Sequence, residues 1–144
     1  MDNRFKDLYM DIAVRTSKMS RAKRLQVGCV AVKDDRIISL SWNGTPSGWD
    51  NECEDIVGIN PDSSLILKTK PEVLHAEMNC LMKMAKSNDS GNNATLFVTH
   101  SPCLDCAKGI FQSGIKEVFY REKYRSDDGI QFLEKCGITI EQYP

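Results

Sequence analysis

The sequence lacks the features that mark membrane proteins, secreted proteins and nucleic-acid-binding proteins. No apolar run in its 144 residues approaches the length that spans a membrane. The first residues, Met1-Asp2-Asn3-Arg4, do not begin a signal peptide. The formal net charge is −1, without the basic excess of most nucleic-acid-binding domains. With 41% hydrophobic and 27% charged residues, the composition predicts a soluble protein without a nucleic-acid or membrane partner.

Histidine is scarce, with two residues, whereas cysteine is frequent, with six. Six Cys without a signal peptide predict a cytoplasmic, reducing location, where they serve as thiols or metal ligands rather than disulfides. Cys29 and Cys80 lie in apolar patterns and are predicted to be core residues. Cys53 lies in a polar stretch and is assigned no role. The chain length predicts a single domain over residues 1–144.

Alternating helical and strand patterns predict an α/β domain. Phe5, Leu8, Tyr9, Ile12 and Ala13 have the spacing of one helical face. Residues 43–71 are rich in Gly, Pro and Asn and show no clear period, which predicts an irregular segment that binds a ligand or moves. The remaining pattern predicts a three-layer α/β/α sandwich around a mixed five-stranded sheet. The predicted helices are 3–18, 75–87, 103–113 and about 126–136, and the predicted strands are 26–33, 36–42, 94–99, 117–121 and 138–141.

Two short segments carry the residues that could bind a metal or transfer protons. They are His75-Ala76-Glu77 and Pro102-Cys103-Leu104-Asp105-Cys106. One His and two Cys make a three-ligand zinc set with an open fourth position, as catalytic zinc sites have. Glu77 is close enough to move protons without binding the metal. Taken alone, the Cys-x-x-Cys half is equally compatible with a redox pair or half of a closed structural zinc site, and the His half with a core histidine. The two halves together favour a catalytic zinc site. Both segments are expected at helix N-termini, which stabilise thiolates.

Three further segments extend these motifs: QVGCV at 26–30, SWNGTPSG at 41–48 and THSPC at 99–103. With them the chain resembles the zinc-dependent cytidine deaminase superfamily, and within it the deoxycytidylate (dCMP) deaminases of T-even-like phages and eukaryotes. The resemblance implies zinc-dependent hydrolysis of dCMP to dUMP and ammonia, which supplies thymidylate synthesis, with Glu77 moving the protons. It also allows a phage-encoded protein in a host cytoplasm. With two His in all and no evident partners for Cys53, we expect one Zn²⁺ per chain.

The resemblance also implies how the nucleotide is held. Asn43 is expected to bond the sugar, and the backbone around Ala76 and Ser101 is expected to contact the base edge. Cations at the entrance, with Tyr124 beside them, are the candidates for phosphate contacts. Solvated surface is the competing interpretation for each cation taken singly. The candidate cations are Arg21, Lys23, Arg24 and Arg125.

Regulation is a further implication, because many dCMP deaminases of this type are homo-oligomers, often hexamers, that dCTP activates and dTTP inhibits, each with Mg²⁺. Residues 44–60 are predicted to form a Gly-rich loop with free backbone N–H groups for phosphate and carboxylates for Mg²⁺. Lys86, on the helix that begins at the zinc site, is a candidate relay. The competing interpretation is a simple lid over the active site. The candidate effector residues in the loop are Gly44, Gly48, Asp50, Asn51, Glu52, Glu54 and Asp55.

Other functions share part of this pattern. A tRNA-adenosine or other polynucleotide deaminase carries both metal motifs, but the absence of basic excess and the SWNGTPSG segment argue against it. A free-nucleoside cytidine deaminase would usually have Cys in place of His75, and riboflavin-pathway deaminases space their Cys differently. A zinc-stabilised binding module would need neither Glu77 nor an open fourth position.

Overall fold

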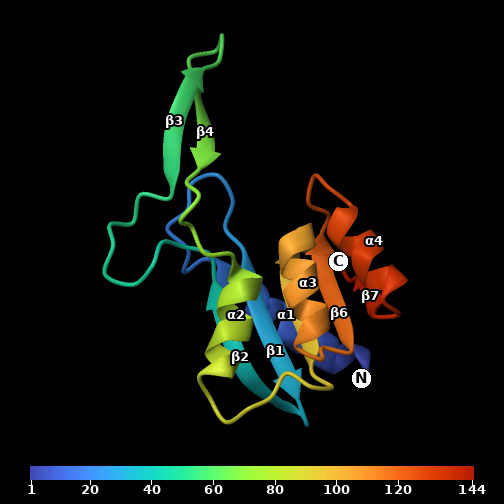
Figure 1. The fold of residues 1–144 in the computed structure, drawn as a ribbon. Helices are drawn as coiled ribbons and strands as arrows, with labels where there is room; N and C mark the ends of the chain where they lie inside the picture. The colour runs from blue at the N-terminus through green and yellow to red at the C-terminus, as the bar shows by residue number, and fades with distance from the viewer.

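The computed structural model describes residues 1–144, which form four helices and seven strands (Figure 1). In chain order they are α1 (Asn3–Ser17), β1 (Gly28–Lys33), β2 (Arg36–Trp42), β3 (Glu54–Ile59), β4 (Leu65–Thr69), α2 (Ala76–Ala85), β5 (Thr95–His100), α3 (Leu104–Gln112), β6 (Glu117–Glu122), α4 (Asp128–Lys135) and β7 (Thr139–Gln142). None of the helices combines the length and the apolar character that crossing a membrane requires.

The central sheet has five strands in the order β2-β1-β5-β6-β7. The strand β1 pairs antiparallel with both β2 and β5, whereas β5, β6 and β7 run parallel. The first two strands are joined by a tight turn through Asp34 and Asp35, both with positive φ, and form a hairpin. The parallel strands are joined through α3 and α4, as parallel strands require a crossover. The predicted mixed five-stranded sheet is confirmed.

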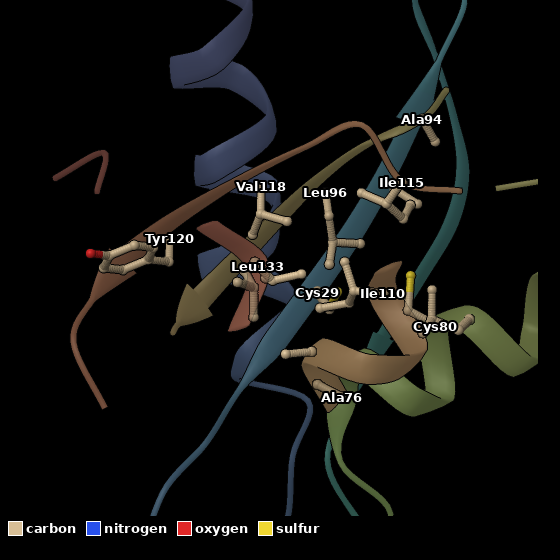
Figure 2. Close-up of a cluster of buried hydrophobic side chains, with 14 of the residues drawn as sticks. Cys29, Ala76, Cys80, Ala94, Leu96, Ile110, Ile115, Val118, Tyr120 and Leu133 are labelled. Carbon is tan, nitrogen blue, oxygen red and sulfur yellow. The ribbon is translucent and has the colours of Figure 1, made fainter. Parts of the chain in front are cut away.

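Helices cover both faces of this sheet, and the inner strands are therefore buried on both sides. Along β1, Val30 and Val32 pack toward α1, while Cys29 and Ala31 join the larger cluster beneath α2 and α3. The larger cluster draws on helices and strands from most of the chain, as Figure 2 shows for Cys29, Cys80, Leu96, Ile110, Val118 and Leu133. Continuous burial explains why these strands are unbroken apolar runs in the sequence. The three-layer sandwich and the core positions of Cys29 and Cys80 are confirmed.

The buried face of α1 is shifted from the predicted one. Leu8 is exposed, whereas Met10, Thr16 and Ser17 are buried. The two hydroxyls are tolerated in the interior because Thr16 Oγ1 and Ser17 Oγ donate to backbone carbonyls of their own helix, at 2.6 Å each. The helix also approaches β1 very closely. A Cβ at Gly28 would lie 2.1 Å from the carbonyl oxygen of residue 13, so only glycine fits there.

The prediction of an irregular segment from residue 43 to 71 is wrong for its second half. Residues 54–69 form an antiparallel two-stranded ribbon, β3 and β4, which projects away from the sheet (Figure 1). The strand pattern is obscured because the register shifts between Ile56 and Gly58, so the alternation of side chains breaks at Val57. The first half, residues 43–53, does lack regular structure apart from a single bridge between Gly44 and Leu74.

Cys53 lies in the loop before β3, as predicted, but its side chain is not exposed there. It is buried in a small cluster with Ala22 and Val73, at the foot of the ribbon. This cluster joins three segments that are distant in sequence: the basic turn after α1, the start of β3 and the segment before α2. All six cysteines are free thiols in the structure. Cys53 therefore has a packing role, as buried free cysteines commonly do.

Candidate active site

The two chemical segments meet at the N-termini of two neighbouring helices. His75 is the N-cap residue of α2 and Cys103 is that of α3, and neither side chain caps its helix. Both side chains are therefore free to point into the space between the helices. Pro102 lies directly before the N-cap Cys103 and therefore outside the first turn of α3, where the sequence had placed it. The helix α4 supports this segment from behind, because a Cβ at Gly129 would lie 2.0 Å from the carbonyl oxygen of Pro102.

The three predicted ligands lie close together. His75 Nδ1 is 3.5 Å from Cys103 Sγ and 3.4 Å from Cys106 Sγ. The ligand atoms of these three residues all lie within 4.8 Å of one another, and no other His, Cys, Asp or Glu group in the chain meets this condition. The set is graded in exposure, with Cys106 buried, Cys103 half-buried and His75 exposed. One side of the set therefore opens toward solvent.

The donor set fits Zn²⁺ on chemical grounds. Hydrogen bonds with Cys106 and His75 lower the pKa of Cys103 to about 4. The pKa of Cys106 is raised, because Cys103 lies against it and because the site is buried. Ionising both thiols is therefore unfavourable, because two thiolates would repel each other. A bound dication would offset this repulsion. Two thiolates and a neutral imidazole are the ligands that zinc prefers, and three of them leave one position open.

Glu77 lies in the first turn of α2 and is buried at 5% exposure. Burial raises the pKa of its carboxyl to about 7. A carboxyl with this pKa both accepts and releases a proton near neutral pH, which general acid–base catalysis requires. Glu77 follows the N-cap His75 by two residues, which keeps it beside the donor set. The predicted role of Glu77 as a proton carrier therefore has a physical basis in the fold.

His75 and Cys103 of the donor set line one pocket, which is also lined by several residues that have no predicted role. Of these, Thr69 is the last residue of β4, Val73 lies between β4 and α2, and Leu25 and Val27 precede β1. His100 belongs to the THSPC motif, which by itself assigns it no function. Its Nδ1 lies 2.9 Å from Thr99 Oγ1, and its Nε2 lies 3.3 Å from Glu122 Oε2. Proximity to Cys103 is the one sequence signal that points to His100.

Asn43 lines this pocket, and its side chain also binds the backbone. Its Nδ2 donates to the carbonyl of Leu25 at 2.8 Å, and its Oδ1 accepts from the N–H of Val27 at 2.9 Å. The amide keeps one N–H and one lone pair for a ligand. Asn43 therefore fixes the pocket wall at residues 25–27 as well as facing the pocket.

Ser101 and Tyr124 also line the pocket, and a hydrogen bond joins them. Ser101 is buried, its hydroxyl accepts from the N–H of Tyr124 at 2.7 Å, and its own N–H donates to the carbonyl of Glu122 at 2.9 Å. Of the two backbone groups of Ser101, the carbonyl is then free to contact a base. Ala76 is the first residue of α2, where backbone N–H groups have no partner inside the helix. The two backbone positions thus offer one acceptor and one donor.

The structure separates the four candidate cations. Arg24 lines the pocket, and its Nη1 lies 3.4 Å from Thr69 Oγ1. Lys23 lines a neighbouring groove and Arg125 stacks on the ring of Tyr124 at 5.5 Å, while Arg21 is exposed and lines neither space. Arg24 is thus the cation placed to reach a ligand beside Glu77.

The predicted effector loop is shorter and less acidic than expected. Residues 44–53 remain a loop, but Glu54 begins β3, and its Oε2 accepts from the N–H groups of Lys23 and Arg24 at 2.9 and 3.0 Å. Glu54 is therefore committed to the pocket wall, which corrects its assignment to a free effector loop. No three of the predicted carboxylates converge. The others are placed as follows: Gly44 bridges to Leu74, Gly48 has a φ of +88°, Asp50 accepts from the N–H of Glu52, Asn51 is exposed, Asp55 lies 3.9 Å from Lys70, and Lys86 caps the end of α2.

A known protein family matches most of the chain, including the donor set and Glu77. The family model described as the cytidine and deoxycytidylate deaminase zinc-binding region matches residues 3–122. The chain belongs to this family. Among its members, the deoxycytidylate deaminase of Saccharomyces cerevisiae is 34% identical over 94% of this chain. The chain spans only 43% of the yeast protein's length. The deoxycytidylate deaminase of phage T4 is also 34% identical, over 94% of this chain and 88% of the phage protein.

A solved structure of this deaminase family is similar over the whole chain. The dCMP deaminase of cyanophage S-TIM5, crystallised with dCMP and dUMP, is 46% identical and has a TM-score of 0.88. The match covers 99% of each chain. The family and the fold inferred from the sequence motifs are thereby confirmed.

Proposed function

We propose that the protein is a zinc-dependent dCMP deaminase, which hydrolyses dCMP to dUMP and ammonia. One observation carries the proposal: Glu77 and two members of the donor set, His75 and Cys103, line the same pocket as Arg24, and the third member, Cys106, lies buried beside them. The similarity to a dCMP deaminase crystallised with dCMP and dUMP supports it. The dUMP formed would supply thymidylate synthesis.

The residues divide the chemistry of hydrolysis among them. Zn²⁺ held by His75, Cys103 and Cys106 would supply Lewis acidity and lower the pKa of water in the pocket. Water adds at C4 of the pyrimidine and the exocyclic amine leaves as ammonia. Glu77 takes a proton from the water and returns protons to N3 and to the leaving amine. Its raised pKa and its burial suit both directions of transfer.

Recognition of the nucleotide follows from the free polar groups around the pocket. The N–H of Ala76 and the carbonyl of Ser101 would bond the base edge, and the remaining amide N–H of Asn43 would bond the sugar. Arg24 would bind the phosphate, with Tyr124 beside it. The bond from the backbone N–H of Arg24 to Glu54 holds the cation at this position.

The choice of substrate provides the first test. A site that orients a phosphomonoester loses its anionic partner when the phosphate is absent. We expect kcat/KM for deoxycytidine to be at least about 100-fold below that for dCMP, and no product from tRNA. Ammonia release from the three substrates in parallel measures this. Equal turnover of deoxycytidine would instead indicate a nucleoside deaminase, and turnover of tRNA a polynucleotide deaminase.

The Arg24→Gln variant assigns the phosphate contact. We expect kcat/KM for dCMP to fall by about 10- to 100-fold, as loss of a charged hydrogen bond predicts. The residual rate with deoxycytidine should stay constant, because the nucleoside has no phosphate. Arg21→Gln is the matched control, since it removes the same charge from an exposed position outside the pocket. If the two variants behave alike, Arg24 has no role in phosphate binding.

We also propose that the enzyme is a homo-oligomer, assembling as a hexamer, that dCTP with Mg²⁺ activates and dTTP with Mg²⁺ inhibits. The first residue of the loop 44–53, Gly44, forms a β-bridge with Leu74, which precedes the donor residue His75. Gly44 N–H donates to the carbonyl of Leu74 at 3.1 Å and Leu74 N–H donates to the carbonyl of Gly44 at 2.8 Å. These residues adjoin Asn43 and His75. A nucleotide that orders the loop would therefore act on the sugar contact and the metal set together.

Initial rates against dCMP concentration test this regulation, at fixed Mg²⁺ with and without each nucleotide. We expect a sigmoidal curve whose half-saturating concentration dCTP lowers and dTTP raises, each by about 5- to 150-fold, the usual range of allosteric coupling. Curves that are hyperbolic and that neither nucleotide moves would leave the loop as a lid over the pocket.

A further inference from the structure

His100 lies between two spaces and takes no part in the hydrolysis as proposed. It is the last residue of β5 and lines the pocket that contains Glu77. It also lines the neighbouring groove, and of the other pocket residues only Arg24 and Leu25 do the same. The ring of His100 therefore lies where the pocket meets the groove, as does the cation proposed to bind the phosphate.

The groove carries a surplus of positive charge, and we call it the basic groove. Its walls come from the end of α1, the turn that follows, and the carboxyl ends of β5 and β6. Glu122 is the one carboxylate among its lining residues, and it contacts His100. Unpaired charges of one sign in a concave surface attract small ions of the opposite sign. Four cations line the groove and form no ion pair, namely Lys18, Lys23, Arg24 and Arg121.

Hydrogen bonds determine which nitrogen of His100 carries the proton. Thr99 Oγ1 accepts from the N–H of Gly28 at 3.1 Å and lies 2.9 Å from His100 Nδ1. The hydroxyl hydrogen of Thr99 is then free to donate to Nδ1, which places the proton of a neutral ring on Nε2. Burial lowers the pKa of His100 and so favours the neutral ring. His100 thus directs an Nε2–H donor at Glu122 Oε2, 3.3 Å away.

The two partners of this last bond are held unequally. The side chain of His100 is 16% exposed and is fixed by Thr99, whereas that of Glu122 is 67% exposed. Their separation is longer than the about 2.7–2.9 Å of a strong charge-assisted hydrogen bond. An exposed side chain in a weak bond moves away at little cost. Glu122 is therefore the partner that an incoming anion can replace.

We propose that the Nε2–H of His100 binds the phosphate of the nucleotide together with Arg24, and that Glu122 occupies this place until the phosphate displaces it. The inference rests on the proposed function, since it names a second ligand for the phosphate of dCMP. A phosphomonoester offers the same kind of acceptor as a carboxylate and carries more negative charge. The unpaired cations of the basic groove therefore favour the phosphate over Glu122. His100 then helps the site to select a nucleotide over a nucleoside, while Glu122 lowers the apparent affinity.

The two partners should respond to substitution with opposite signs. His100→Ala should raise KM for dCMP by about 10- to 100-fold, as loss of a hydrogen bond to a charged group predicts. Its kcat should stay within about threefold, because the contact is made equally in the ground state and the transition state. Glu122→Gln should lower KM by about two- to tenfold, because the competing charge is gone. Turnover of deoxycytidine should change in neither variant, since the nucleoside has no phosphate.

The matched control for Glu122→Gln is Glu134→Gln, which should keep the KM of the wild type. Glu134 is an exposed carboxylate on α4 and lines neither the pocket nor the basic groove. A second substitution of the histidine, His100→Gln, places an amide N–H near the position of Nε2 and should recover part of the lost affinity. In the double variant of His100→Ala and Glu122→Gln, the gain from Glu122→Gln should vanish, because it acts through His100.

Binding can also be measured without catalysis. Calorimetric titration with dUMP, which is not consumed, should give the same order of affinities: Glu122→Gln, wild type, His100→Gln and His100→Ala. Circular dichroism and zinc content verify that each variant is folded. The preference of the wild type for dCMP over deoxycytidine tests the proposed function by itself, whereas the order of the variants in dUMP binding tests His100 whatever the turnover shows.

Each remaining outcome contradicts a stated part of the proposal. Weaker binding in both His100→Ala and Glu122→Gln would make the pair a structural contact and overturn the displacement. A gain from Glu122→Gln that persists without His100 would assign the effect to the field of the groove alone. If His100→Ala lowers turnover of deoxycytidine as much as that of dCMP, the ring does not act on the phosphate and the assignment of His100 is wrong.

Discussion

Glu77→Gln is expected to lower kcat for dCMP by about 100- to 10,000-fold, the range for loss of an acid–base group. The amide has nearly the shape of the carboxyl but cannot carry a proton from water to the base. Because Glu77 is not part of the donor set, the zinc content should remain at about one ion per chain. The burial that raises the pKa of Glu77 also favours the neutral amide, so the fold should tolerate the change.

The matched control for this experiment is Glu72→Gln. Glu72 precedes α2, is half-buried and does not line the pocket, so its replacement by the amide should leave kcat within about twofold. Single-turnover kinetics at saturating dCMP separate the chemical step from product release. Normal turnover by Glu77→Gln would remove Glu77 from the mechanism, and loss of zinc would make it a ligand instead.

Much of the fold can be predicted from the sequence, for a physical reason. Strands buried on both faces, such as β1 and β5, are continuous apolar runs, and short runs of this kind bounded by turn residues are typical of buried strands. The donor set is equally predictable, since few functions bring His and Cys-x-x-Cys together with a neighbouring Glu.

Other features depend on tertiary structure that no local pattern encodes. The ribbon escapes prediction because its register shift between Ile56 and Gly58 breaks the alternation of side chains along β3. Arg21 and Arg24 look equivalent in the sequence, and only the bonds to Glu54, which is 30 residues from Arg24, place Arg24 in the pocket. Leu8 fits the predicted helical face, yet Met10 is buried in its place, because α1 packs on β1 through a face that includes Ala13 and Ser17.

Cys103→Ala is expected to lower the zinc content from about one ion per chain to near zero, measured by metal analysis after dialysis. Loss of a direct ligand should cost more than the about 10- to 100-fold in metal affinity that loss of an outer hydrogen-bond partner costs. Activity toward dCMP should fall with the metal. Stability and solubility should fall as well, because metal binding contributes to folding and Cys106 would face His75 without a dication between them.

Cys136→Ala is the matched control for this loss. Cys136 is a free thiol at the C-terminal end of α4 and takes no part in the donor set, so this variant should keep its zinc and its turnover. Thermal unfolding with and without a chelator links the two readouts. Chelation should lower the Tm of the wild type and of Cys136→Ala but leave that of Cys103→Ala unmoved, since the last has no zinc to lose. Full zinc retention by Cys103→Ala would show that Cys103 is not a ligand, and the assigned metal site would then be wrong.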